Sequence, residues 1–347
     1  MENLSLRKPV KPLKVKKNQE TSGLLQEMGG TAFQGKNLSL AFQIWKEMLK
    51  EETTIFFGLA GALIPAGMRQ ILVYLIQNRF IDCLVSTGAN LFHDLHETLG
   101  FYHWQGHHFV DDVVLKKEGI DRIYDVFASE KEFVESDLYI MRFARSIRAN
   151  RPLNTREFFA RLGKQLLKDK KEEGIITAAY QAGVPIYCPA LGDSSIGIAL
   201  ALERNNPPLL FDILADVRET AFIAAQSKAT GVIFLGGGTP KNFIQQTEVT
   251  ANMMGLKVPG HHYAIQITTD APHWGGLSGC TFEESQSWGK IAEQARKVTL
   301  YCDSTIALPI LVSALVQEWG ELIKKRRRPN MRKLYSWPAN YNPGKRK

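Results

Sequence analysis

The sequence predicts an α/β fold of the Rossmann-like kind, with one mostly parallel sheet covered by helices on both faces. Two observations predict it. Short apolar runs of strand length recur along the chain, and longer stretches with helical periodicity lie between them. Apolar runs are typical of strands buried on both faces, and strand-then-helix repetition implies crossover connections between parallel strands. The expected strands cover residues 54–59, 82–86, 185–188, 231–235, 263–268 and 298–302.

The chain divides into an arm, a large domain and a tail. Residues 1–37 are expected to form a basic N-terminal arm, because Pro9 and Pro12 interrupt any helix and the lysines repel one another. Residues 38–325 are expected to form a single large domain without an internal repeat or linker. Residues 326–347 form a basic tail, which we expect to be loop from residue 329. The expected helices cover residues 40–49, 66–77, 157–168, 213–228, 282–295 and 304–325.

The positive charge of the chain is concentrated at its two ends. The 347 residues carry a formal net charge of +8. Residues 1–17 hold six basic residues and one acid, and residues 324–347 hold ten basic residues and no acid, which leaves 27 basic and 34 acidic residues between them. An acidic body with basic ends favours solvated tails over a nucleic-acid site. We therefore expect no nucleic-acid partner.

The cysteines and the hydropathy pattern indicate a cytoplasmic protein. The cysteines are widely spaced and form no CxxC pair, as expected of reduced thiols in a cytosolic protein. No apolar stretch reaches the length of a membrane span, and the basic N-terminus lacks the apolar segment of a secretory signal. We therefore expect no membrane partner.

Small residues follow four of the expected strands, at residues 58–62, 86–90, 236–241 and 268–270. Small residues at a strand end let a backbone approach a ligand, and a helix N-terminus that follows favours phosphate. These segments predict a dinucleotide or nucleotide site at one edge of the sheet. None of them matches GxGxxG or GxxxxGKS/T, the two classical phosphate-binding motifs. The candidates are Gly61, Thr87, Gly88, Ala89, Gly236, Gly237, Gly238, Thr269 and Asp270.

Lys290 is the candidate nucleophile. It ends the segment Ser-Trp-Gly-Lys on the helix expected over residues 282–295, where Glu284 and Trp288 are four apart and share a face. A lysine beside a tryptophan in a partly desolvated pocket is favoured in the neutral form that imine formation requires. The alternative is a surface lysine on an amphipathic helix.

The histidines raise the hypothesis of a metal site, for which His93 and His96 are the best pair. They are three apart on an expected helix, next to Asp94 and Glu97. Two such imidazoles could supply two ligands, but the chain has no HExxH pattern and offers no third ligand. We therefore expect no metal. His93 and Asp94 remain candidates for substrate contact, because they follow the strand end at residues 86–90.

The chain resembles the deoxyhypusine synthase family over roughly residues 40–320. The most specific matches are Ser287-Trp288-Gly289-Lys290 and the triple glycine at residues 236–238, which occur in the order and at the spacing of the family. The other matching segments are residues 57–58, 67–69, 84–90, 160–164, 189–197 and 301–304.

The resemblance implies a homotetrameric enzyme with NAD bound between subunits and a polyamine substrate. In the family, NAD takes a hydride from spermidine, and the lysine that Lys290 matches captures the aminobutyl group as an imine. That group then passes to a lysine of the hypusine-containing translation factor. Trp288 would stack on the carbon chain of the amine, while Glu284 and Asp303 match carboxylates that meet its cationic ends or the cofactor. Contacts with NAD are implied for Thr87, Gly88, Asp193, Thr269, Asp270, Ser278 and Gly279.

Several positions depart from the family pattern. Ile198 and Leu277 replace substrate-binding aspartates, and Phe92-His93 replaces acidic residues. Asn242 replaces a histidine and remains a candidate for substrate contact. Each charge-assisted bond to an ammonium group contributes about 1.5–3 kcal/mol, so spermidine would bind differently here. We expect an NAD-dependent aminoalkyl transferase whose acceptor is a small amine such as putrescine or agmatine. The alternatives are a true deoxyhypusine synthase and a non-catalytic NAD-binding regulatory protein.

Overall fold

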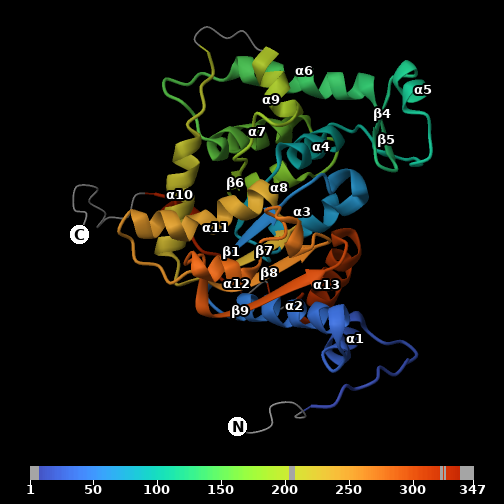
Figure 1. The fold of residues 1–347 in the computed structure, drawn as a ribbon. Helices are drawn as coiled ribbons and strands as arrows, with labels where there is room; N and C mark the ends of the chain where they lie inside the picture. Colours follow the sequence, from blue (N-terminus) through green and yellow to red (C-terminus); the bar gives the residue numbers. More distant parts are fainter. Residues whose placement is uncertain (1–7, 203–207, 321–322, 324–325, 337–347) are drawn as a thin grey trace.

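The structure, a computed structural model, describes residues 8–202, 208–320, 323 and 326–336, and it contains the expected parallel sheet (Figure 1). The six strands of this sheet are all parallel and lie in the order β6-β2-β1-β7-β8-β9. The predicted α/β fold is therefore confirmed. The strands are β1 (Thr53–Leu59), β2 (Cys83–Ser86), β6 (Ile186–Tyr187), β7 (Ala229–Leu235), β8 (His261–Thr268) and β9 (Ile291–Tyr301).

Alternate side chains of each strand pack into two separate cores. Phe57 and Ile233 belong to one core, whereas Phe56 and Val232 belong to the other. This follows from the two-residue period of a strand, and it means that helices cover both faces of the sheet, as predicted. The first core includes α2 (Phe33–Lys50), α3 (Arg69–Gln77), α4 (Gly88–Thr98), α6 (Glu130–Ser146), α7 (Thr155–Asp169), α8 (Ile175–Ala182), α9 (Ser195–Leu202) and α13 (Ser304–Trp319), and the second includes α10 (Ile213–Gln226), α11 (Gly238–Met253), α12 (Phe282–Ser287) and α14 (Met331–Leu334).

The helix predicted over residues 282–295 is wrong in its second half. Helix α12 ends at Ser287, and strand β9 begins at Ile291. Gly289 has a φ of 69°, the left-handed conformation that commonly ends a helix. Strand β9 lies at the edge of the sheet and carries many half-exposed polar residues, which made its pattern resemble a helix. Lys290 therefore lies in the turn between α12 and β9, and not on a helix.

Helical structure begins earlier than the sequence predicted. Helix α1 (Thr21–Met28) and the start of α2 at Phe33 both fall within the expected arm of residues 1–37. The Ser22 N–H donates to Gln317 Oε1 at 2.9 Å, which ties α1 to α13. The charge pattern did not reveal this docking, because the partner of α1 is almost 300 residues away. Residues 1–7 of the arm lie outside the described residues.

The basic tail is partly folded onto the body of the protein. The Arg326 guanidinium donates to both carboxylate oxygens of Asp82, at 2.6 and 3.0 Å. Both side chains are buried, and a buried carboxylate requires such a partner. The short helix α14 follows at Met331, where loop was expected. Residues 337–347 of the tail lie outside the described part of the chain.

A second, antiparallel sheet was not expected from the sequence. Its strands pair in the order β3 (Trp104–Gln105), β5 (Val126–Ser129) and β4 (Ile120–Ile123). With helix α5 (Asp112–Lys117), strands β4 and β5 project from one end of the molecule (Figure 1). Strands of two to four residues are too short to show a clear period in the sequence.

Two further sequence-based points concern the cysteines and membrane spans. The four cysteines are free, in agreement with the expectation of reduced thiols. Within the described residues, no helix is long and apolar enough to cross a membrane.

Candidate active site

The loops that follow β1, β7, β8 and β9 enclose a cavity of about 270 Å³, which we name the strand-end pocket. The loops meet there because parallel strands end at the same edge of a sheet. The pocket therefore brings together residues that are far apart in the sequence. The predicted site residues that line this pocket are Gly61, Gly236, Gly237, Thr269, Asp270, Ser278 and Asp303.

A glycine turn at the N-terminus of α11 forms one side of the strand-end pocket. Gly236 and Gly238 have φ values of 74° and 54°, a conformation that glycine adopts at little cost. A Cβ atom on Gly237 would lie 2.4 Å from Ser278 Cα, so the turn packs directly against Ser278. No side chain caps α11, and its first N–H groups are open to an anion. The turn therefore fits the pyrophosphate of a dinucleotide.

The remaining predicted cofactor residues border the strand-end pocket without lining it. Thr87 caps α4 and donates through Oγ1 to the Gly61 carbonyl at 2.7 Å, which brings Gly88 and Ala89 close to the pocket. Asp193 is followed by Ser194. A Cβ atom on Gly88 would lie 2.2 Å from Ser194 Oγ, so the segment that carries Asp193 packs against the N-terminus of α4. The other two, Gly238 and Gly279, directly follow lining residues.

A second cavity of about 270 Å³, which we name the lysine pocket, adjoins the strand-end pocket at the segment of residues 275–280. Ser278 of this segment lines the strand-end pocket, and its neighbours Leu277 and Cys280 line the lysine pocket. It brings together four predicted site residues, Lys290, Trp288, Glu284 and Asn242. Leu277, one of the departures from the family pattern, also lines it. Among the lining residues, Glu284 is the one acidic side chain. The rest of the lining is Lys241, Gln245, Pro272, Gly275, Gly276 and Cys280.

Lys290 is fixed through its backbone and leaves its side-chain nitrogen free. Its N–H donates to the Ser285 carbonyl at 3.1 Å, and its carbonyl accepts from the His261 N–H at 3.0 Å. Nζ lies 5.3 Å from the centre of the Trp288 ring, and no described residue accepts a hydrogen bond from it. Lys290 is 9% exposed, whereas Trp288 is 66% exposed.

Lys241 lines the same pocket, but its nitrogen is surrounded by acceptors. Nζ donates to Gln266 Oε1 at 2.8 Å, to the Ser278 carbonyl at 3.5 Å and to the Cys280 carbonyl. The side chain is 1% exposed, and burial lowers the pKa of Lys241 to about 8. An ammonium group with three acceptors is a structural cation, whereas a lysine with no acceptor can attack a carbon. The geometry therefore favours Lys290 as the nucleophile.

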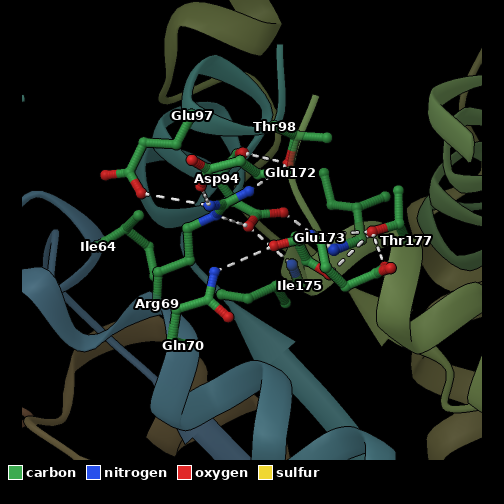
Figure 2. A network of polar contacts seen from close by, with 12 residues as sticks. Ile64, Arg69, Gln70, Asp94, Glu97, Thr98, Glu172, Glu173, Ile175 and Thr177 are labelled. Carbon is green, nitrogen blue, oxygen red and sulfur yellow. Dashed lines mark hydrogen bonds and ion pairs between the residues drawn. The ribbon is translucent and has the colours of Figure 1, made fainter. Parts of the chain in front are cut away.

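Asp94 lies in a buried polar network and lines neither pocket (Figure 2). Its carboxylate accepts from Arg69 Nε at 3.0 Å and from the N–H groups of Ile175 and Ile176 at 2.7 and 2.9 Å. It therefore joins α4 to α3 and to the N-terminus of α8, and burial raises the pKa of Asp94. Because Asp94 follows the strand end at residues 86–90, we expected it to contact the substrate. Helix α4 instead directs its side chain into the buried network.

His93 is also turned away from the two pockets. Its Nδ1 lies 2.9 Å from His103 Nε2, and His103 Nδ1 lies 2.8 Å from Glu97 Oε1. Burial lowers the pKa of His93 to about 3, so its ring is neutral at ordinary pH. The structure thus does not bring His93 together with Lys290, Trp288 and Glu284.

Sequence reasoning did not single out Lys241 and Gln266 as site residues. Gln266 is the one amide in the apolar run of residues 263–268, and a polar residue in a buried strand needs a partner. Lys241 stands in the first turn of the helix that follows the triple glycine. These signals were present in the sequence, but neither indicated that the two side chains meet.

Comparison with known proteins gives the family of the chain. The family model described as deoxyhypusine synthase matches residues 23–315. A protein of Methanosarcina acetivorans named "Probable deoxyhypusine synthase 2" is 51% identical over 92% of this chain and 93% of its own length. The protein named "Probable deoxyhypusine synthase 1" in the same organism is 43% identical over 88% and 94%.

A solved structure with the same fold comes from Entamoeba histolytica and is described as a candidate deoxyhypusine synthase. It covers 86% of this chain and 93% of its own, with a TM-score of 0.61 and 19% identity. The family match, the sequence relatives and this shared fold agree. The chain belongs to the deoxyhypusine synthase family.

Proposed function

We propose that this protein is an NAD-dependent aminoalkyl transferase. It takes an aminobutyl group from a polyamine such as spermidine, holds it as an imine on Lys290 and passes it to a small amine. The observation that carries this proposal is the Lys290 amine, which no described residue binds, in a pocket that adjoins the strand-end pocket at residues 275–280. An amine attacks a C=N carbon through its lone pair, and no described acceptor binds Lys290 Nζ.

The strand-end pocket supports NAD as the cofactor. The glycine turn and the open N–H groups of α11 suit a pyrophosphate, and Asp270 and Asp303 offer carboxylates to ribose hydroxyls. When bound, NAD would accept a hydride from the amine carbon and return it at the end of the transfer.

Lys290 would act on a substrate that has lost a hydride and a proton and therefore contains a C=N bond. Its amine attacks this carbon, the bond to the original nitrogen breaks, and the diamine leaves with a proton. The aminobutyl carbon is then doubly bonded to Nζ. An acceptor amine would attack the same carbon and displace Lys290, which leaves a C=N bond to the acceptor nitrogen. A hydride and a proton would reduce this bond to a stable secondary amine. Trp288 is available to stack on the carbon chain, and Glu284 to bind an ammonium group.

Two observations favour an altered substrate over the lysine of a translation factor. Glu284 is the one acidic side chain in the described lining of the lysine pocket, where Leu277 and Asn242 replace family residues. In addition, M. acetivorans has two relatives, and the chain is more similar to the one named 2 than to the one named 1. Such a duplication permits divergence in substrate. Putrescine and agmatine are the acceptors that we propose.

Borohydride trapping tests the proposal. The protein is incubated with NAD and labelled spermidine, putrescine or agmatine, reduced, and digested for mass spectrometry. We expect an adduct on Lys290 in the wild type and none in Lys290→Ala, which should still bind NAD. The absence of an adduct with every amine would refute both enzymatic functions and favour the regulatory alternative. Transfer to a hypusine-type translation factor, but not to small amines, would establish the deoxyhypusine synthase alternative.

We also propose a homotetramer with active sites at subunit interfaces. The projecting sheet supports this, because Trp104, Phe109 and Tyr124 are exposed there, and exposed apolar surface of this kind is typical of an interface. Light scattering gives the mass in solution, and a monomeric mass would refute the proposal.

A further inference from the structure

Lys241 carries a buried charge between the two pockets. It stands in the first turn of α11 and is 1% exposed. An ammonium group in such a position is strongly disfavoured unless hydrogen bonds replace its water. Its acceptors are Gln266 and the carbonyls of Ser278 and Cys280, so its bonds reach strand β8 and the segment of residues 275–280, where the two pockets adjoin.

Gln266 extends this cluster to the glycine turn. Its Oε1 accepts from Lys241, while its Nε2 donates to the Gly236 carbonyl at 2.9 Å and to the Ser278 carbonyl at 2.7 Å. The Ser278 carbonyl thus receives a hydrogen bond from each of the two side chains. We name Lys241 and Gln266 the lysine–glutamine clamp.

The clamp fixes the orientation of peptide groups at the strand-end pocket. The C=O and N–H of a trans peptide point in opposite directions. Because the Gly236 carbonyl points to Gln266, the Gly237 N–H points away from the clamp. Gly237 lines the strand-end pocket and precedes α11, where an open N–H can bind an anion. A Cβ on Gly237 would lie 2.4 Å from Ser278 Cα, so the two held segments also pack directly on each other.

We propose that Lys241 is a positioning residue for the cofactor. With Gln266 it holds the glycine turn and the Ser278 segment in the conformation that binds the dinucleotide. This inference rests on the NAD site of the proposed function, but it does not depend on imine formation at Lys290.

The charge of Lys241 is influenced by groups from three segments. Cys280 on the segment of residues 275–280 and Glu284 on α12 favour its charged form, and Lys290 in the turn after α12 opposes it. Burial lowers the pKa of Lys241 to about 8. The clamp should therefore lose its charge as the pH rises through about 8, and NAD affinity of the wild type should fall over the same range.

Calorimetric titration with NAD alone, without any amine, tests the proposal. Because Lys241→Met removes hydrogen bonds to a charged group, we expect NAD affinity to be about 10- to 100-fold weaker and independent of pH near 8. Lys241→Arg keeps the charge and should restore part of the affinity. Lys228→Met removes an exposed lysine that pairs with Glu52 at 3.1 Å, and it should bind NAD as the wild type does.

Hydrogen–deuterium exchange gives a second readout on the protein without NAD. Amides of residues 275–281 should exchange faster in Lys241→Met, while those of the central strands keep the wild-type rate. Gln266→Leu, which removes the other half of the clamp, provides a second variant if Lys241→Met does not fold. Unchanged NAD affinity together with unchanged exchange in the variants would overturn the proposal.

The same variants separate this inference from the proposed reaction. NAD affinity is measured without any amine, so the effect of Lys241→Met on cofactor binding is read independently of the adduct on Lys290. If the wild type binds NAD but forms no adduct, the transfer reaction is refuted, whereas the effect of Lys241→Met on NAD affinity still stands.

Discussion

Lys241 and Lys290 are the same residue type in one pocket, but their side-chain nitrogens have different hydrogen-bond surroundings. Carbonyls from the segment of residues 278–280 and the Gln266 amide converge on Lys241. The turn after α12 presents no such acceptor to Lys290 Nζ. The difference lies in the direction of backbone carbonyls, which residue identity does not specify.

Gly237→Ala should weaken NAD binding. The new Cβ would lie 2.4 Å from Ser278 Cα, so the glycine turn and Ser278 would have to separate. Since small displacements at a binding site are costly, we expect NAD affinity to fall on the order of tenfold or more, as measured by calorimetry. Gly276→Ala is the matched control, because a Cβ there meets nothing within 4 Å. Equal affinities in the two variants would contradict the argument.

Asp94→Asn should lower stability without a specific effect on ligand binding. It removes the charge that pairs with the buried Arg69 guanidinium and weakens the cap of α8. Breaking a buried ion pair from one side costs roughly 3–5 kcal/mol in the free energy of unfolding, which urea titration would measure. The exposed Asp125→Asn serves as a control. A loss of NAD binding in a fully folded Asp94→Asn protein would instead restore Asp94 as a ligand contact.

At the scale of the elements, the turn between α12 and β9 decides where the candidate nucleophile Lys290 lies. On a helix continued to residue 295, Lys290 and Trp288 would lie on nearly opposite sides, since residues two apart are rotated by about 200° about the axis. Gly289 instead ends the helix, and β9 pairs with β8 from His261 onward. The backbone of Lys290 is thereby attached to the sheet, which gives its amine a fixed position in the lysine pocket.

Helix α4 should make the protein sensitive to acid through its buried histidines. Burial, followed by the nearby His103, lowers the pKa of His96 to about 4. The unfolded chain takes up this proton near pH 6.5. The stability that neutral His96 contributes is therefore complete above pH 6.5 and is lost as the pH falls toward 4.

The comparison of wild type with His96→Gln isolates this contribution. The wild type should lose roughly 2–3 kcal/mol of unfolding free energy relative to His96→Gln between pH 6.5 and 4, as measured by urea titration. Other buried groups contribute equally to the pH dependence of both proteins, so their effects cancel in the difference. Glu248, whose pKa is raised by burial to about 7, is one of them. Parallel pH profiles for the two proteins would contradict the argument, because they would mean that His96 takes up its proton equally in the folded and unfolded states.

At the scale of the whole molecule, segments from both ends of the chain complete the fold. Helix α1 is tied to α13, and the tail is tied to Asp82 at the start of β2. Arg326→Met should cost roughly 3 kcal/mol in the free energy of unfolding, because it leaves the buried Asp82 with weaker partners. Arg327→Met, at the exposed neighbouring position, is the matched control. Similar unfolding midpoints for the two variants would refute the anchoring role.

The parallel sheet and the strand-end pocket could be predicted because they depend on local patterns. Apolar runs identified all six strands of the sheet, and small residues after four of them marked the edge where Gly61, Gly237 and Asp270 meet. The placement of Asp94 and His93 could not be predicted in this way. Which side of α4 faces the pocket depends on how that helix packs against α8 and the loop that carries His103.

The sequence by itself determined the fold class, the family and the candidate nucleophile Lys290. Strand and helix periods are properties of neighbouring residues, and the Ser-Trp-Gly-Lys segment is specific without any coordinates. Only the tertiary structure decided that Lys290 lies in a turn, that Lys241 and Gln266 clamp the two loops, and that Asp94 is a structural anion. These outcomes depend on carbonyls and side chains from distant segments, which become neighbours only when the chain is folded.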